Sequence, residues 1–165
     1  MATTPRLSLP FLSVAQAQKE FAHNESLQTL DVLVAGSVEE GPRATPPTSP
    51  VIGSCYLVAE AATGAWAGSS QCVAAWTSGG WRFVSPIDGM SLYDRASGTF
   101  ALFRNGAWEI GIVRATSVAI GGQQVLGQRA AAVESPVGGT VTDAEARSTI
   151  NAILDALRQH GLVES

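Results

Sequence analysis

The stretch of residues 53–109 constrains the fold of this chain more than any other feature. It holds all four tryptophans of the chain and most of its other aromatic residues. Turn signals that contain glycine interrupt it at short intervals, and the last of them is Asn105-Gly106. Short apolar runs separated in this way are typical of antiparallel strands joined by hairpins, and Asn-Gly favours a tight type I′ turn. The sequence therefore predicts a small, Trp-rich antiparallel β domain, arranged as a meander or a barrel-like sheet.

The apolar runs between the turns give the positions of the strands. Strands are predicted at residues 54–58, 72–77, 81–84, 91–94, 100–104 and 107–112. A sheet this small needs large side chains to fill its core, so at least two of the tryptophans are expected to be buried. Trp66 lies in a turn-rich segment between the first two strands and is predicted to be the most exposed of the four.

An apolar arm and a helical region precede the β domain. Pro5 and Pro10 disfavour a helix in residues 1–12, whose leucines predict packing against a neighbour. A helix is predicted from Ser13, where a capping box begins. Its apolar face rotates near residues 23–25, so we expect either two short helices or one helix covered on two sides. Gly36 ends the helical pattern.

A second helix is predicted near the end of the chain, where Thr142 opens another capping box. Apolar residues then recur at spacings of four, three and four, as in the seam of a short coiled coil. They are Ala146, Ile150, Ile153 and Leu157. A helix this short is marginal alone in water, so it is expected to dock on its own β domain or on copies of itself. These four residues are the candidate oligomer interface.

The predicted class is α+β, and the chain is expected to have five parts. They are an N-terminal arm and helical attachment region (1–40), a Pro-rich linker (41–50), the Trp-rich antiparallel β domain (51–112), a Gly-rich β or irregular segment (113–141) and a C-terminal oligomerisation helix (142–165). The Gly-rich segment is expected to form short strands that wrap around threefold partners or the preceding sheet.

The charge composition restricts the partners. Charged residues make up 15% of the chain, against about 25% in an ordinary soluble domain. A chain with so few charges is expected to bury surface against copies of itself. The predicted oligomer is a trimer, with other cyclic states possible. The net charge is −4 and Lys19 is the only lysine, which argues against partners such as nucleic acid and anionic membranes. Neither a secretory signal nor a membrane span is expected, so the chain is predicted to be made in the cytoplasm.

Residues that carry catalysis or bind metals are sparse. The two histidines, His23 and His160, lie far apart, and no cluster of Cys, His or Asp has metal-ligand spacing. No nucleophile elbow, phosphate-binding loop or dinucleotide motif is present. Acids such as Asp88 and Glu109 fall at turns and strand ends, where capping is their usual role. We expect no enzyme activity, no metal and no cofactor.

The tryptophans leave one alternative open. Aromatic faces stack on sugar rings, so an exposed tryptophan face would suit a carbohydrate-binding module. The candidate glycan contacts are Trp66 and Trp81. The other interpretation is that the tryptophans fill the core.

Two groups of short motifs stand out in the chain. Leu9-Pro10 is followed by Gln16-Ala17-Gln18-Lys19, His23-Asn24-Glu25 and Leu30-Asp31, and the β region adds Gly80-Trp81-Arg82-Phe83 and Pro86-Ile87-Asp88-Gly89. Together they resemble an uncharacterised domain family of bacterial prophages and gene transfer agents, whose members occur in head spikes, fibres and tail-associated proteins. The resemblance implies a virion structural part. Its implied attachment residues, at the helix junction, are Gln16, Lys19, His23, Asn24 and Glu25.

The expected function is that of a non-enzymatic structural protein of a phage-like particle or gene transfer agent. It would be a head-spike or fibre base, or a tail-associated attachment component, assembled into the virion. The expected partners are copies of itself and capsid or tail proteins. The alternative is a carbohydrate-binding module that attaches particles to cell-surface polysaccharide, and a glycan-cleaving enzyme is a third hypothesis.

Overall fold

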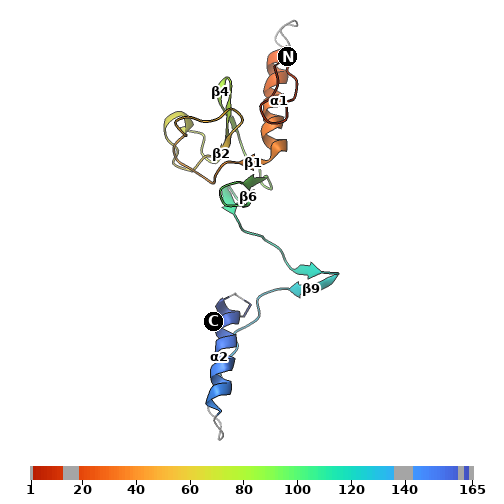
Figure 1. Cartoon of the computed structure of the whole chain (residues 1–165), viewed down its shortest axis with the longest axis vertical. Coiled ribbons are helices and arrows are strands. Elements are labelled where there is room, and N and C mark those ends of the chain that lie inside the picture. Colours follow the sequence, from red (N-terminus) through yellow and green to blue (C-terminus); the bar gives the residue numbers. More distant parts are fainter. Residues whose placement is uncertain (1, 13–18, 136–142, 160–161, 164–165) are drawn as a thin grey trace. The chain divides into compact units, whose positions relative to one another are not determined.

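Two compact units make up the chain. The computed structural model describes residues 2–12, 19–135, 143–159 and 162–163, which divide between Met1–Val113 and Arg114–Ser165. The described elements are two α-helices, one 3₁₀ turn and nine strands in three sheets, so the predicted α+β class is confirmed (Figure 1). None of the sheets among the described residues closes on itself, so no closed barrel is found there.

A single helix, α1 (Lys19–Ala35), precedes the sheets of the first unit. It runs without a break through residues 23–25, so of the two predicted arrangements the structure has one helix. Gly36 ends it as predicted, because its φ of +49° is the left-handed conformation that a helix C-terminus needs. The predicted start at Ser13 lies outside the described residues.

Two sheets form the body of the first unit. One has the order β2–β3–β4 and consists of β2 (Cys55–Leu57), β3 (Val73–Thr77) and β4 (Gly80–Val84). The other has the order β1–β5–β6–β7 and consists of β1 (Ser37–Val38), β5 (Ser91–Asp94), β6 (Thr99–Arg104) and β7 (Ala107–Ile110). Every strand except β1 lies within two residues of its predicted bounds.

The segment that starts with β1 connects the two sheets through its backbone. β1 itself pairs in parallel with β5. Immediately afterwards, the Glu39 N–H donates to the Cys55 carbonyl (2.8 Å) and the Arg43 N–H donates to the Leu57 carbonyl (3.0 Å). The beginning of the Pro-rich segment 41–50 therefore runs along β2 inside this unit.

The core of the first unit has two parts, divided by the alternation of side chains along β2. The larger part gathers Val32, Val38, Cys55, Leu57, Val73, Ala75, Leu92, Ala101, Phe103 and Trp108. The smaller part is an aromatic cluster that gathers Tyr56, Val58, Trp66 and Ala74, with Trp81 against it. Burial of this many apolar side chains is the main source of stability for a unit of this size.

The second unit contains one β-hairpin and one helix. The hairpin is formed by β8 (Val118–Ile120) and β9 (Gln123–Leu126), joined at Gly121-Gly122, where φ is +58° and +80°. The helix is α2 (Ala144–Gln159). Its N-cap is Asp143, whose Oδ1 accepts the Ala146 N–H at 2.9 Å, whereas the predicted Thr142 lies outside the described residues. In the described ranges neither helix is long and apolar enough to cross a bilayer.

Candidate functional site

The N-terminal hairpin, residues 2–11, lies beside α1 (Figure 1), and a buried carboxylate on that helix fixes it there. Asp31 lies on α1 and is 1% exposed. It accepts three hydrogen bonds from the hairpin, from Thr4 Oγ1 (2.7 Å), Arg6 N–H (3.0 Å) and Leu7 N–H (2.5 Å). A buried carboxylate is tolerated when donors surround it in this way. The arm therefore lies against α1 of its own chain, while Leu7 and Leu12 stay exposed.

The guanidinium of Arg6 anchors the same hairpin to the end of α1. It donates to the carbonyl of Val32 in the last turn (3.4 Å), to the carbonyl and hydroxyl of Ser37 (2.8 and 2.6 Å) and to Cys55 Sγ (3.3 Å). A cation suits the negative end of the helix dipole. All of these acceptors are uncharged, so this guanidinium keeps its net charge at the edge of the core.

A groove of about 620 Å³ opens next to Arg6. Its lining joins the hairpin, the end of α1, β1 and the residues that enter β2, and it includes Arg6, Ser37, Glu39, Tyr56 and Arg95. Arg95 Nη1 pairs with the Glu39 carboxylate at 3.2 Å. Two guanidinium groups and one carboxylate leave the groove with an excess of positive charge. It can hold a polar group, but it brings together neither two acids nor a nucleophile with a base.

The thiol of Cys55 lies beside this groove and is chemically inert. Burial raises the pKa of the Cys55 thiol from 9.0 to about 11, and the nearby Arg6 guanidinium offsets only part of that rise. A thiol with so high a pKa stays protonated at neutral pH and is a poor nucleophile. Both cysteines of the chain are free thiols.

Four of the five predicted attachment residues lie on α1 and have different surroundings. Asn24 bonds the backbone of Leu12, with its Oδ1 accepting the N–H at 3.0 Å and its Nδ2 donating to the carbonyl at 3.3 Å. The Glu25 carboxylate pairs with Arg82 of β4 at 3.2 Å. Both residues therefore bind other parts of the same unit, while His23 is exposed. Gln16 lies outside the described residues, and of Lys19 only the backbone is described.

The prediction that Trp66 is the most exposed tryptophan is wrong. Trp66 is 0% exposed. It belongs to the 3₁₀ turn η1 (Gly64–Trp66) and packs against Tyr56 and Trp81, with ring centroids 5.8 and 5.1 Å away. The small residues around it shape the turn, and the turn directs the ring inward. Its indole Nε1 is buried with no hydrogen-bond partner, so this ring is held by apolar contacts alone.

The other candidate glycan contact, Trp81, is partly exposed on β4. Trp76 on β3 is its direct cross-strand partner, and the two ring centroids lie 4.9 Å apart. Trp108 belongs to the larger core and donates from Nε1 to the Gln71 carbonyl at 2.8 Å. Trp66 and Trp108 fulfil the prediction that at least two tryptophans are core residues.

The predicted seam of α2 lies on the surface of its unit. Ile150 is 46% exposed and Ile153 is 55% exposed, Ala146 is exposed and Leu157 is half-buried. Leu154, which is next to the seam, is buried instead. The helix is tied to its own chain at one end, where the Leu162 N–H donates to the Leu157 carbonyl and Arg158 Nη2 donates to the Val133 carbonyl. The seam remains available to a partner.

Sequence reasoning missed the hairpin anchors and the groove. Arg6, Asp31 and Arg95 are far apart in the sequence and form no motif. The one available signal was Asp31, an acid in the middle of an apolar helical stretch. No group of three His, Cys, Asp or Glu side chains that would hold a metal ion occurs in the part of the chain that the structure describes.

Comparison with known proteins gives a family and no assigned activity. A family model described as "Protein of unknown function (DUF2793)" matches residues 23–109. The match starts within α1 and ends in β7, so it spans most of the first unit and stops before the second. No curated protein matches the chain.

Proposed function

The chain belongs to the DUF2793 family of proteins of unknown function, and we propose that it is a non-enzymatic structural protein of a phage-like particle or gene transfer agent. In this proposal it is a homo-oligomer, with a trimer favoured, that forms a head-spike or fibre base or a tail-associated attachment component. The motifs quoted above from the arm, α1 and the β region support the assignment to a virion.

The observation that carries the proposal is the exposed apolar seam of α2. Fully burying a large apolar side chain contributes roughly 1.5–3 kcal/mol, so each seam residue left in water forgoes much of that stabilisation. Ile150 and Ile153 occupy both kinds of core position of a heptad, and isoleucine at both positions favours three or more strands over two. A trimer of α2 helices would bury the seam.

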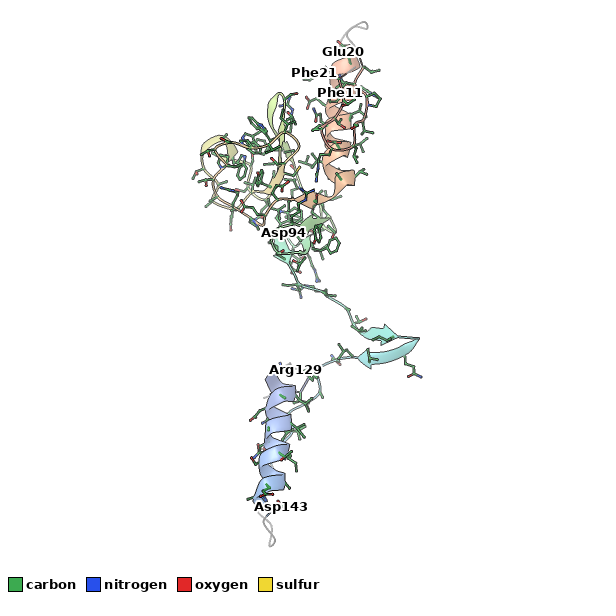
Figure 2. The ribbon with its side chains drawn as sticks, in the orientation of Figure 1. Phe11, Glu20, Phe21, Asp94, Arg129 and Asp143 are labelled. Carbon is green, nitrogen blue, oxygen red and sulfur yellow. The ribbon has the colours of Figure 1, made fainter. Side chains whose placement is uncertain are left out.

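A second apolar surface suits attachment to another virion protein. Leu7 and Leu12 of the N-terminal arm are 39% and 49% exposed, and Phe21 in the first turns of α1 is 69% exposed. Figure 2 shows Phe11 and Phe21 toward the N-terminal end of α1. Asn24 joins the arm and the helix in this region. We assign this surface to contact with capsid or tail proteins.

The oligomer is tested with a variant that places charge in the seam. Multi-angle light scattering at micromolar concentration is expected to give three times the mass of one chain for the wild type. The double variant Ile150→Asp/Ile153→Asp is expected to give the mass of one chain. Ser148→Asp is the matched control, because Ser148 is exposed on α2 and lies off the seam, and it is expected to remain oligomeric. A monomeric wild type would overturn the oligomeric part of the proposal.

The virion assignment is tested on particles. Particles from a culture that makes this protein are purified by density gradient and analysed by quantitative mass spectrometry. The chain is expected to band with the major capsid protein at a fixed ratio across the peak. Its absence from the particle fraction, with the chain present in the lysate, would contradict the assignment.

A carbohydrate-binding module is the alternative, and the pair of Trp76 and Trp81 favours it. Both rings are partly exposed and adjacent on neighbouring strands. The test is binding on a glycan array. Binding by the wild type that is lost in Trp81→Ala, with the first unit still folded, would place this alternative ahead. Trp66→Ala is unsuitable as a probe because Trp66 is a core residue.

A further inference from the structure

The β8–β9 hairpin is an ordered element without a core. Every residue from 111 to 135 is exposed. The hairpin carries four large apolar side chains, with exposed fractions between 40% and 68%, and they are Val118, Ile120, Val125 and Leu126. A hairpin of two strands with nothing packed on it is marginally stable in water at best. These strands therefore need a partner.

The edges of the hairpin are also open to pairing. Soluble proteins usually protect exposed edge strands with charged residues or proline. Residues 115–128 contain neither a charged residue nor a proline. A shift in register between Val118 and Ala119 distorts the far end of the ladder, so the regular edge lies near the turn. There, Ala119 pairs with Gln124 and Ile120 pairs with Gln123.

We infer that the β8–β9 hairpins of neighbouring copies of this chain pair edge to edge and form one sheet between chains. The inference rests on the self-association proposed above, because the α2 seam brings the hairpins to a high local concentration. The second unit favours a copy of itself as partner. It holds four arginines and five acidic residues, a net charge of −1, so close approach of two copies meets little repulsion.

The geometry of the turn identifies the amides that make the pairing. In a two-residue hairpin loop, the residues that flank the loop exchange hydrogen bonds with each other. These residues are Ile120 and Gln123. Hydrogen-bonded and non-bonded pairs alternate along an antiparallel ladder, so the Ala119 and Gln124 amides point away from the partner strand. They are the outward donors available to a second chain.

The test is amide hydrogen exchange, followed by NMR on the full chain. In the wild-type oligomer, the amide protons of Ala119 and Gln124 are expected to exchange at least about tenfold more slowly than they would in a random coil. In the Ile150→Asp/Ile153→Asp variant, which dissociates through α2, that protection is expected to be lost. Protection kept in the dissociated variant would overturn the inference, because the hairpin would then be covered by its own chain.

A proline variant tests the edge directly. Gln124→Pro removes one outward donor and leaves the hydrogen bonds inside the hairpin in place, so it is expected to abolish protection at Ala119. Gln124→Thr keeps the amide and is the matched control. The tryptophans all lie in unit 1, so their fluorescence reports whether that unit stays folded in both variants.

The outcomes separate this inference from the proposed function. An oligomeric wild type with unprotected Ala119 and Gln124 amides would overturn the pairing of the hairpins and leave the oligomer intact. A monomeric wild type would overturn both.

Discussion

At the scale of single residues, Trp66 and Trp108 have the same ring and similar burial but different hydrogen bonding. The Trp66 Nε1 has no partner, whereas the Trp108 Nε1 donates to the Gln71 carbonyl. Phenylalanine at either site removes similar volume, but only Trp108→Phe breaks a hydrogen bond. We expect Trp108→Phe to lower the free energy of unfolding by about 1–2 kcal/mol more than Trp66→Phe does. Urea denaturation followed by circular dichroism measures both, and equal losses would contradict the assigned bonding.

The Cys55 thiol gives a second prediction at this scale, in the pH dependence of stability. Its pKa is raised by burial to about 11 in the folded chain, from 9.0. The folded state thus holds the proton more tightly than the unfolded state. The resulting stabilisation is complete below pH 9 and is lost as the pH rises to 11. The free energy of unfolding is expected to fall by about 2–3 kcal/mol across this window.

A matched variant isolates the contribution of that thiol. The fall between pH 9 and 11 is expected to be smaller in Cys55→Ala by the same amount, with Cys72→Ala resembling the wild type. Thermal unfolding at a series of pH values measures this fall in the free energy of unfolding for each protein. An identical slope in all three proteins would show that the thiol is not buried.

At the scale of the elements, Gly53 sets how closely the N-terminal hairpin approaches β2. Its φ is +92°, and a Cβ at this position would lie 3.3 Å from Pro5 Cβ. Gly53→Ala is expected to cost about 1–3 kcal/mol through backbone strain and crowding, and to make residues 2–11 easier to cleave by protease. Gly79→Ala is the control, because Gly79 has no positive φ and its new Cβ would meet the flexible end of Arg82 at 3.4 Å and the Thr77 hydroxyl at an ordinary contact distance of 3.8 Å. Equal protease sensitivity of the two variants would contradict this role.

The elements also show which parts of the fold the sequence could predict. Six strands were predicted because each lies between turn signals that act locally. β1 was missed because a two-residue strand shows no alternation and because its parallel partner, β5, lies more than 50 residues away. The exposure of Trp66 was predicted wrongly because the glycines around it define the path of the turn but not the side on which the ring lies.

The groove could not be predicted from the sequence, because its charged lining residues come from distant parts of the chain. Arg6, Glu39 and Arg95 come from the arm, the segment after β1 and the end of β5. Only the tertiary fold brings these three residues together, and their spacing along the chain does not predict the groove. By contrast, the α2 seam is a periodic pattern within one helix, so spacing alone predicted which residues form it. Spacing left open whether the seam docks on its own β domain or on copies of the chain.

At the scale of the whole molecule, the two units differ in how they can be stable. Both core clusters lie in Met1–Val113. Among the described residues of the second unit, only Leu154 and Val163 are buried apolar residues. A fragment of residues 1–113 is therefore expected to fold, to remain monomeric and to unfold within a few degrees of the full chain, as measured by tryptophan fluorescence. A fragment that fails to fold would show that the second unit supplies part of the core.

The two-residue strand β1 has a consequence for synthesis on the ribosome. Residues 37–43 form backbone bonds with β2 on one side and β5 on the other, yet they are translated before either. The nascent chain must reach Asp94 and expose it outside the exit tunnel before this short segment can take its place. Until then α1 and its hairpin can contact only the sheet β2–β3–β4, and the sheet that contains β1 forms last.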